Sequence, residues 1–354
     1  MEFNVKGITF KKDDLETKEL LELKVNSISK SHLFHLLPGG KRAMLLLRAG
    51  DFIESSFVSK YIDRGMSSCY ELNVCSEEDL IEYREMWLEL SSAKSQRDQY
   101  LVRDKILCKI AKDFINSKEK SFLSFVVSSF EIFYNLDADT IEKFQRISMV
   151  LYSRALLTSS ISLITLLCNG YVDFSFIKDF YNTTFLMDYG LVEYEDFNYA
   201  LSLASEAERN DPGSGISILD KYKRSEGEKI LFKGHPNISY EYAITLKDNF
   251  KNPEILDVIQ LHHEKVDGSG FPNGYSYSCL SDTETLLMFC DYYIPFKEHI
   301  FKIGDGNLII NGYFDDLMKM ENAYMLPINK LKINWAMMMT WAIDQIHVKK
   351  DKAS

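Results

Sequence analysis

The stretch LHHEKVDGSGFPNG, from Leu261 to Gly274, decides how the rest of the sequence is interpreted. It places two adjacent histidines and a glutamate directly before a glycine-rich turn, in a chain of 354 residues that has seven histidines. A buried imidazole is costly unless its nitrogens find partners. Adjacent imidazoles followed by a carboxylate favour a metal site, because they can bind one ion or two neighbouring ions. The alternative is that both histidines are core residues.

The residues before this stretch predict a helix over 252–265, NPEILDVIQLHHEK. Asn252 is the expected N-cap and Pro253 the first helical residue. Ile255, Val258 and Ile259 then share one face with His262, and His263 lies about 100° further round the helix. We therefore expect His262 to point toward the core.

Composition limits the function classes. A hydrophobic fraction of 46% with 26% charged residues is typical of a globular protein, and the length favours two domains. The formal charge of −11 argues against general DNA binding, which needs clustered Lys and Arg. The six cysteines form no CxxC pair and the N-terminus has no signal-peptide pattern, so we expect reduced thiols in a cytoplasmic protein. The longest apolar run, residues 155–168, is shorter than the roughly 20 residues of a membrane span and predicts a buried core helix.

The chain divides into three predicted regions. Residues 1–92 read as a small α/β domain with a hairpin turn at Pro38–Lys41, and residues 93–135 as a connecting helix that serves either as a dimerisation surface or in the core. Residues 136–354 read as successive helices. Within them, the segment 209–229, RNDPGSGISILDKYKRSEGEK, is predicted to be a surface loop because it is rich in Gly, Ser and charged residues.

The segment 262–274 closely resembles the HHExxDGxGYP motif of the HD-GYP family, with Phe271 in place of the tyrosine. The resemblance implies an all-helical domain that hydrolyses cyclic di-GMP at a centre of two or three metal ions. The segment 234–246, GHPNISYEYAITL, is similar to the family's HPxxG helix start, which makes His235 a metal ligand and puts Ser239 where glycine is usual. The segment 281–293, SDTETLLMFCDYY, is similar to the helix that supplies a ligand aspartate, here Asp291, and Ser281 with Glu284 predicts its capping box.

The motif that gives the family its name is incomplete. This chain has FLMDYGLV at 185–192 where the family has LLHDIGK, so Met187 replaces the histidine, Asp188 is kept and Leu191 replaces a lysine. The family's first-helix histidine would fall near 153–155, and no histidine occurs between His35 and His235. The resemblance therefore implies one divalent ion (Fe, Mn, Zn or Ni) rather than two or three. Its ligands would be Asp188, His235, His262 and His263, with Asp188 also catalytic and Asp291 left on the side of the missing ion.

The resemblance, with these departures from the motif, implies a degenerate HD-GYP protein of cyclic di-GMP signalling. Its phosphodiesterase activity is expected to be lost or weak, and it would act by binding ligand, metal or a protein partner. The resemblance assigns substrate or partner contacts to the loop residues Glu264, Asp267, Gly268, Gly270, Phe271 and Pro272. The N-terminal region resembles a small sensory domain often found ahead of such modules. Two alternatives stay open: an active, unconventional phosphodiesterase with a reduced metal site, and a structural pseudoenzyme that binds no metal.

Overall fold

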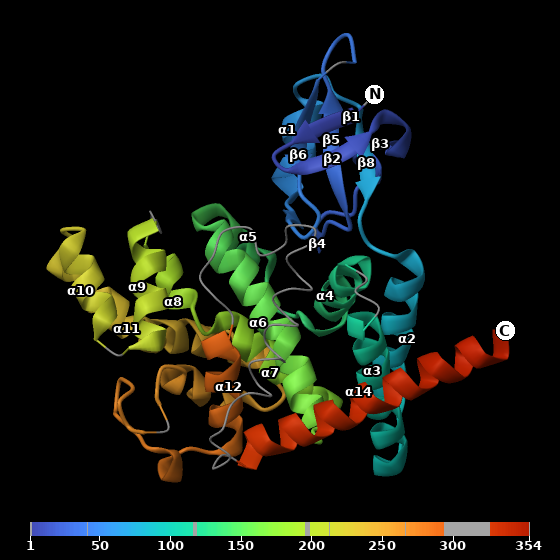
Figure 1. Cartoon of the computed structure of the whole chain (residues 1–354). Helices are drawn as coiled ribbons and strands as arrows, with labels where there is room; N and C mark the ends of the chain where they lie inside the picture. The colour runs from blue at the N-terminus through green and yellow to red at the C-terminus, as the bar shows by residue number, and fades with distance from the viewer. Residues whose placement is uncertain are drawn as a thin grey trace.

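The computed structural model describes residues 2–40, 42–115, 119–194, 199–211, 213–265, 267–293 and 326–353. It confirms the predicted class, a mainly α chain in which a small N-terminal α/β domain precedes a body of helices (Figure 1). The strands and the short helix α1 form the upper lobe in that view, and the remaining helices form the lower one.

The N-terminal domain is built from antiparallel strands. A four-stranded sheet has the order β3-β8-β5-β6, and the pairs β1-β2 and β4-β7 lie beside it. The predicted hairpin around Pro38 joins β5 to β6, where Gly39 and Gly40 have the positive φ that such turns require. The bounds are β1 Glu2–Val5, β2 Ile8–Lys11, β3 Glu16–Glu19, β4 Ser27–Ile28, β5 Ser31–Leu36, β6 Ala43–Leu47, β7 Phe52–Ile53, α1 Ser55–Ile62 and β8 Ser68–Asn73.

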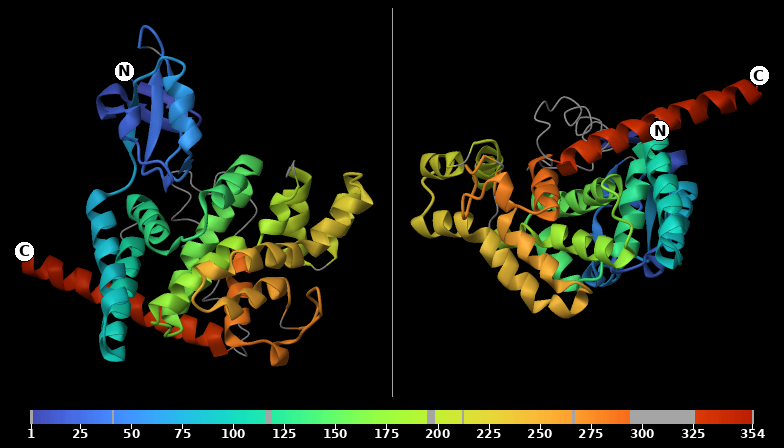
Figure 2. Two further views of the ribbon diagram at one scale, coloured as in Figure 1. Left: turned by 180° about the vertical axis from the view of Figure 1, so that it is seen from behind. Right: turned by 90° about the horizontal axis from the view of Figure 1, so that it is seen from below.

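The helices of the body pack around α6, which lies between α5, α7, α12, α4 and α3 in contact with each. The long helix α14 crosses α3 and α6 and projects beyond them (Figures 1 and 2). The bounds are α2 Glu77–Ser92, α3 Gln96–Ile115, α4 Glu119–Phe133, α5 Ala138–Ile147, α6 Met149–Cys168, α7 Phe174–Leu186, α8 Tyr189–Val192, α9 Tyr199–Asn210, α10 Ser214–Lys221, α11 Glu226–Thr245, α12 Asp282–Tyr293 and α14 Leu326–Ala353; the 3-10 helices are η1 Lys12–Asp14, η2 Leu20–Glu22, η3 Lys247–Asn249, η4 Pro253–Leu261 and η5 Tyr277–Cys279.

Helix α6 is the core helix that the apolar run predicts. Every residue from Val150 to Cys168 is buried. Five hydroxyl side chains among them donate to backbone carbonyls three or four residues earlier: Thr158, Ser159, Ser160, Ser162 and Thr165. The helix ends at Gly170, whose positive φ and neighbouring backbone bonds form a Schellman motif. Among the described helices, α6 is long and apolar enough to cross a membrane by length and composition, and its whole apolar window lies inside the fold.

The N-terminal domain is tied to the body at the turn between β6 and β7. The Tyr152 hydroxyl of α6 donates to the Gly50 carbonyl, and the Gln145 side chain of α5 bonds both backbone groups of Phe52. These bonds satisfy backbone groups of the turn against the start of the core helix. The contact therefore joins the domain to the helix that runs toward the candidate site.

The prediction of a surface loop over 209–229 is wrong for most of that segment. Helices α9, α10 and α11 occupy it, with a short connection on each side of α10. The buried carboxylate of Glu208 accepts hydrogen bonds from the backbone N–H groups of Gly213 and Gly215 at the start of α10. A Cβ at Gly215 would overlap the Ala204 carbonyl oxygen, so here glycine allows two helices to approach closely.

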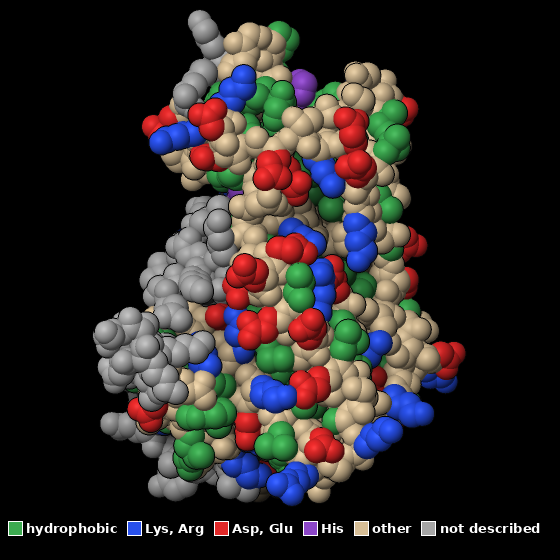
Figure 3. Space-filling model, turned by 90° about the vertical axis from the view of Figure 1, so that its right-hand side faces the viewer, with side chains coloured by type: hydrophobic (Ala, Val, Ile, Leu, Met, Phe, Trp, Pro, Cys, Tyr) green, Lys and Arg blue, Asp and Glu red, His purple; other side chains and the backbone are tan. Residues whose placement is uncertain are grey.

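On the face that includes the outer sides of α2 and α3, acidic and basic side chains are interspersed (Figure 3). The described side chains visible in this view form no continuous basic patch. This distribution agrees with the acidic composition of the chain.

Candidate metal centre

Asp188 lies in the short connection between α7 and α8 and is buried. The backbone of α8 touches α11 directly, because a Cβ at Gly190 would overlap the carbonyl oxygen and Cα of His235. The Ser239 hydroxyl accepts a hydrogen bond from the Gly190 N–H at 2.7 Å. Ser239, the residue that departs from the family pattern, thus fixes α8 against α11 and brings Asp188 close to His235.

His235 lies in the middle of α11, so the prediction that a helix starts there is wrong. The helix begins at Glu226, where Ser225 and Glu228 form a capping box, and Pro236 lies inside it. The His235 Nδ1 lies 2.6 Å from the Phe232 carbonyl oxygen. A carbonyl only accepts, so Nδ1 carries the proton and Nε2 keeps a lone pair, which faces His263 Nε2.

His262 and His263 follow η4, which differs from the regular α-helix predicted for 252–265. The segment 253–261 is a 3-10 helix, and the Asn252 side chain donates to Asp179 of α7 instead of capping it. His262 nevertheless points inward as predicted and is buried. Its Nδ1 lies 2.6 Å from the Ile259 carbonyl oxygen, so the same reasoning leaves its Nε2 as an acceptor.

Four side chains converge at one point: Asp188, His235, His262 and His263. Their ligand atoms all lie within 4.8 Å of one another, and all four residues are buried. The Nε2 atoms of His235 and His263 are 3.0 Å apart, and the Nε2 atoms of His235 and His262 each lie 3.8 Å from Asp188 Oδ1. Metal–nitrogen bonds of about 2.0–2.1 Å place two ligands of a tetrahedral ion ~3.3 Å apart. Three imidazoles and a carboxylate at these separations fit one divalent transition metal.

Two acceptor atoms in this set have no hydrogen-bond partner among the described residues: Asp188 Oδ1 and His262 Nε2. Leaving such a buried lone pair unsatisfied costs about 1–3 kcal/mol. Both atoms face the same point as His235 Nε2, which carries no proton. A cation at this point would satisfy all of them.

Two of the three histidines are already in the protonation state that a metal needs. Burial, together with the neighbouring His262, lowers the pKa of His235 to about 3. Burial also lowers the pKa of His262. Neutral imidazoles are metal ligands, whereas imidazolium ions are not. A metal at neutral pH would therefore displace no proton from these two rings.

Asp291 lies on α12 beside the four-residue set, and Ser281 and Glu284 form the predicted capping box of that helix. Its Oδ2 is 3.7 Å from His263 Nδ1, whereas its Oδ1 pairs with the guanidinium of Arg154 from α6. Arg154 also pairs with Asp188 Oδ2. Sequence reasoning missed Arg154; the only signal was a charged residue in the apolar helix, at the position where the family's first-helix histidine is expected.

The glycine-rich loop after His263 is held from its inner side. The buried Glu264 carboxylate accepts hydrogen bonds from the backbone N–H groups of Asn273 and Tyr275, at 2.7 and 2.8 Å. A Cβ at Gly270 would overlap backbone atoms of residues 263–265, and the Phe271 ring stacks on His263 with centroids 4.7 Å apart. These contacts fix the position of the His263 ring.

The remaining loop residues lie on the outside. Asp267 bonds the backbone N–H and hydroxyl of Ser269, which lowers the pKa of its carboxyl. Gly268 has the positive φ of a tight turn, and Pro272 is exposed.

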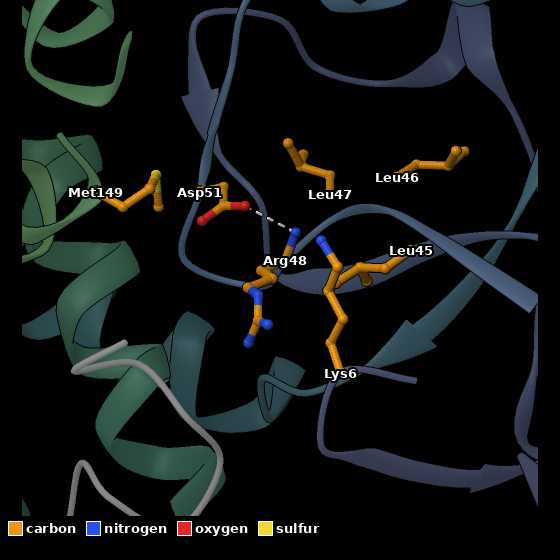
Figure 4. A pocket seen from close by; sticks show the side chains of 7 residues that line it. All are labelled: Lys6, Leu45, Leu46, Leu47, Arg48, Asp51 and Met149. Carbon is orange, nitrogen blue, oxygen red and sulfur yellow. Dashed lines mark hydrogen bonds between the residues drawn. The ribbon is translucent and has the colours of Figure 1, made fainter. Parts of the chain in front are cut away.

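A cavity of about 550 Å³ lies apart from this centre, between β6 and the start of α6 (Figure 4). Burial raises the pKa of Asp51 there to about 6, although the Arg48 backbone N–H donates to its carboxylate. The lining residues are Lys6, Leu45, Leu46, Leu47, Arg48, Asp51 and Met149, so none of the four converging residues belongs to it.

Comparison with known proteins gives one similar structure. No protein-family model matches the chain, and no curated protein matches it. Among solved structures, the chain is similar to Bd1817, an HDG"Y"P protein from Bdellovibrio bacteriovorus, with 16% sequence identity and a TM-score of 0.36 over 90% of this chain and 98% of that chain. At this identity and TM-score, any assignment of function depends on the chain's own side chains.

Proposed function

We propose that this chain is a degenerate HD-GYP protein that binds one divalent transition metal through Asp188, His235, His262 and His263. It would act in cyclic di-GMP signalling by binding the nucleotide or a protein partner, in the cytoplasm, rather than by fast hydrolysis. The observation that carries the proposal is the convergence of buried lone pairs on one point, with Asp188 Oδ1 and His262 Nε2 unpartnered. Fe, Mn, Zn and Ni all accept such a set of three nitrogens and one oxygen.

The replacement of two family residues argues against fast hydrolysis. The residues that replace the family's histidine and lysine, Met187 and Leu191, have 0% exposed surface and pack in the hydrophobic core, so neither reaches a ligand. When bound, a metal supplies positive charge for phosphoryl oxygens and lowers the pKa of a bound water. Losing part of that charge typically costs several kcal/mol of barrier, on the order of a thousandfold in rate.

The four converging side chains also enclose the point where an ion would bind. The most exposed of them, His263, has 8% of its surface accessible, and Phe271 covers its ring. Four protein ligands around a tetrahedral ion make a closed site, whereas catalytic sites keep one position open for water or substrate. We infer that the outer surface of the loop, around Asp267 and Pro272, is where a partner or nucleotide makes contact.

The test uses the full-length protein loaded with Mn²⁺. Cyclic di-GMP is titrated by calorimetry and its hydrolysis is followed on the same sample. The variant is His262→Ala, and His32→Ala is the matched control, because His32 is also buried but lies in β5, away from the centre. We expect nucleotide binding without turnover, and metal retained in His32→Ala but lost in His262→Ala.

Three results would contradict the proposal. Turnover that His262→Ala abolishes would show that the chain is an active, unconventional phosphodiesterase. Wild-type protein that retains no metal would show that the histidines are core residues. Metal without nucleotide binding would contradict the nucleotide-binding part of the proposal and leave a protein partner as the ligand.

A further inference from the structure

Arg154 is the most deeply buried charged side chain near the centre, with 0% of its surface exposed. Its Nη1 pairs with Asp188 Oδ2, and its Nη2 pairs with Asp291 Oδ1. The same Nη2 also donates to the Asp291 backbone carbonyl at 2.9 Å. The guanidinium therefore bridges two carboxylates that come from different parts of the chain.

An arginine in this position has to keep its charge. The guanidinium stays protonated in proteins, and burying it without partners costs several kcal/mol. The two carboxylates offset that cost, and their planar pairing with the guanidinium fixes their orientation. Arg154 thus sets the direction in which Asp188 presents its other oxygen.

The two oxygens of Asp188 face different cations. Oδ2 pairs with Arg154, whereas Oδ1 faces the Nε2 atoms of His235 and His262 at 3.8 Å each. In two-metal sites the ions lie about 3.5–4 Å apart and share ligands. A second ion on the Oδ2 side of Asp188 would need Asp188 and Asp291 as its ligands. The guanidinium of Arg154 already occupies that side and pairs with both carboxylates.

We propose that Arg154 is the built-in second cation of this centre, so that the site takes one divalent ion beside the histidines and excludes another. This inference rests on the proposed metal site. Two carboxylates and one guanidinium leave one net negative charge beside the histidine rings. One divalent ion brings this buried group to a single positive charge, and a second ion would leave a large excess of positive charge in a low-dielectric site.

The experiment measures bound metal per chain in full-length protein, after loading with excess Mn²⁺ and desalting. Native mass spectrometry counts the ions, and circular dichroism checks the fold. Wild type and the charge-conserving Arg154→Lys are expected to hold one ion. Arg154→His removes the fixed charge and adds a ligand, so it is expected to hold two.

A milder variant covers the case in which Arg154→His does not fold. Asp291→Asn is expected to keep one ion, with weakened Mn²⁺ affinity, because Asp291 pairs with the arginine and not with the ion. A folded Arg154→His that still holds one ion, or an Asp291→Asn that loses its ion, would overturn the inference. Wild type without any ion would instead overturn the proposed metal site itself.

Discussion

Two buried clusters in this molecule each place one cation between two aspartates, yet only one of them resembles a binding site. In the first, Lys109 of α3 lies 2.5 Å from Asp79 Oδ1 and 2.8 Å from Asp113 Oδ2, and the Tyr83 hydroxyl donates to Asp113. In the second, Arg154 joins Asp188 and Asp291.

The clusters differ in whether all of their buried polar atoms have hydrogen-bond partners. None of the buried polar atoms of Lys109, Asp79 and Asp113 lacks a hydrogen-bond partner, whereas Asp188 Oδ1 and His262 Nε2 do. A satisfied ion cluster joins helices, here α2 and α3. A cluster with buried lone pairs left unsatisfied has a capacity for a ligand. The presence of buried charge alone therefore does not identify a site.

The largest expected effect comes from breaking the satisfied cluster. Lys109→Met should lower the free energy of unfolding by about 3–5 kcal/mol, because two buried aspartates lose their cation. Urea denaturation measures the loss. Bound Mn²⁺ per folded chain should stay as in wild type, and loss of the ion in this variant would contradict the distinction between the two clusters.

Acid should weaken the histidine centre, whereas Lys109 keeps its charge. The folded-state pKa of His235 is about 3, below the ordinary value of about 6.5. Between these values the unfolded chain binds a proton that the folded protein does not, so stability falls as the pH falls. From pH 6.5 to 4 this residue alone should cost roughly 3 kcal/mol.

Burial also lowers the pKa of Lys109, but the bonds and charges of Asp113 and Asp79 outweigh it, so its pKa is raised and the lysine stays charged in this range. Urea midpoints of metal-free protein measure the effect. A second buried histidine, His32, also contributes, because burial and the charge of Arg48 lower its pKa to about 4. The variant His32→Gln removes that contribution. A urea midpoint that stays constant between pH 6.5 and 4, in both wild type and His32→Gln, would contradict the lowered pKa of His235.

A smaller effect tests how α8 is held against α11. Gly190→Ala should lower stability by about 1–3 kcal/mol, because the added methyl overlaps the His235 backbone. It should also weaken Mn²⁺ binding by roughly 10–100-fold, as changes behind metal ligands do. The matched control is Gly234→Ala, where a Cβ meets nothing within 4 Å in the same helix as His235. Equal Mn²⁺ affinity in the two variants would show that this contact does not position Asp188.

The sequence predicted the helical body and the inward direction of His262, because hydrophobic periodicity encodes which face is buried. The structure also brings together Asp188, His235, His262 and His263, the four residues that the family resemblance grouped. The sequence did not predict the role of Arg154, whose partners lie 34 and 137 residues away in the chain. Local patterns carry no information about such a pairing.

The errors have the same origin. Helix α10 was missed because its Gly and Ser content favours a loop, whereas the buried carboxylate of Glu208 in the preceding helix accepts hydrogen bonds from the N–H groups of Gly213 and Gly215 at its start. Residues 253–261 form a 3-10 helix whose expected cap, Asn252, bonds Asp179 of α7. At residues 253–261 a tertiary contact outweighs the local propensity, and at α10 a side-chain contact from the preceding helix does so.

The most direct measurement is the number of metal ions per chain in purified wild-type protein, determined by elemental analysis after loading with Mn²⁺ or Zn²⁺ and desalting. We predict one ion per chain in wild type and none in His262→Ala. Wild-type protein that holds no ion, or that holds two, would contradict a centre made of one metal and one arginine.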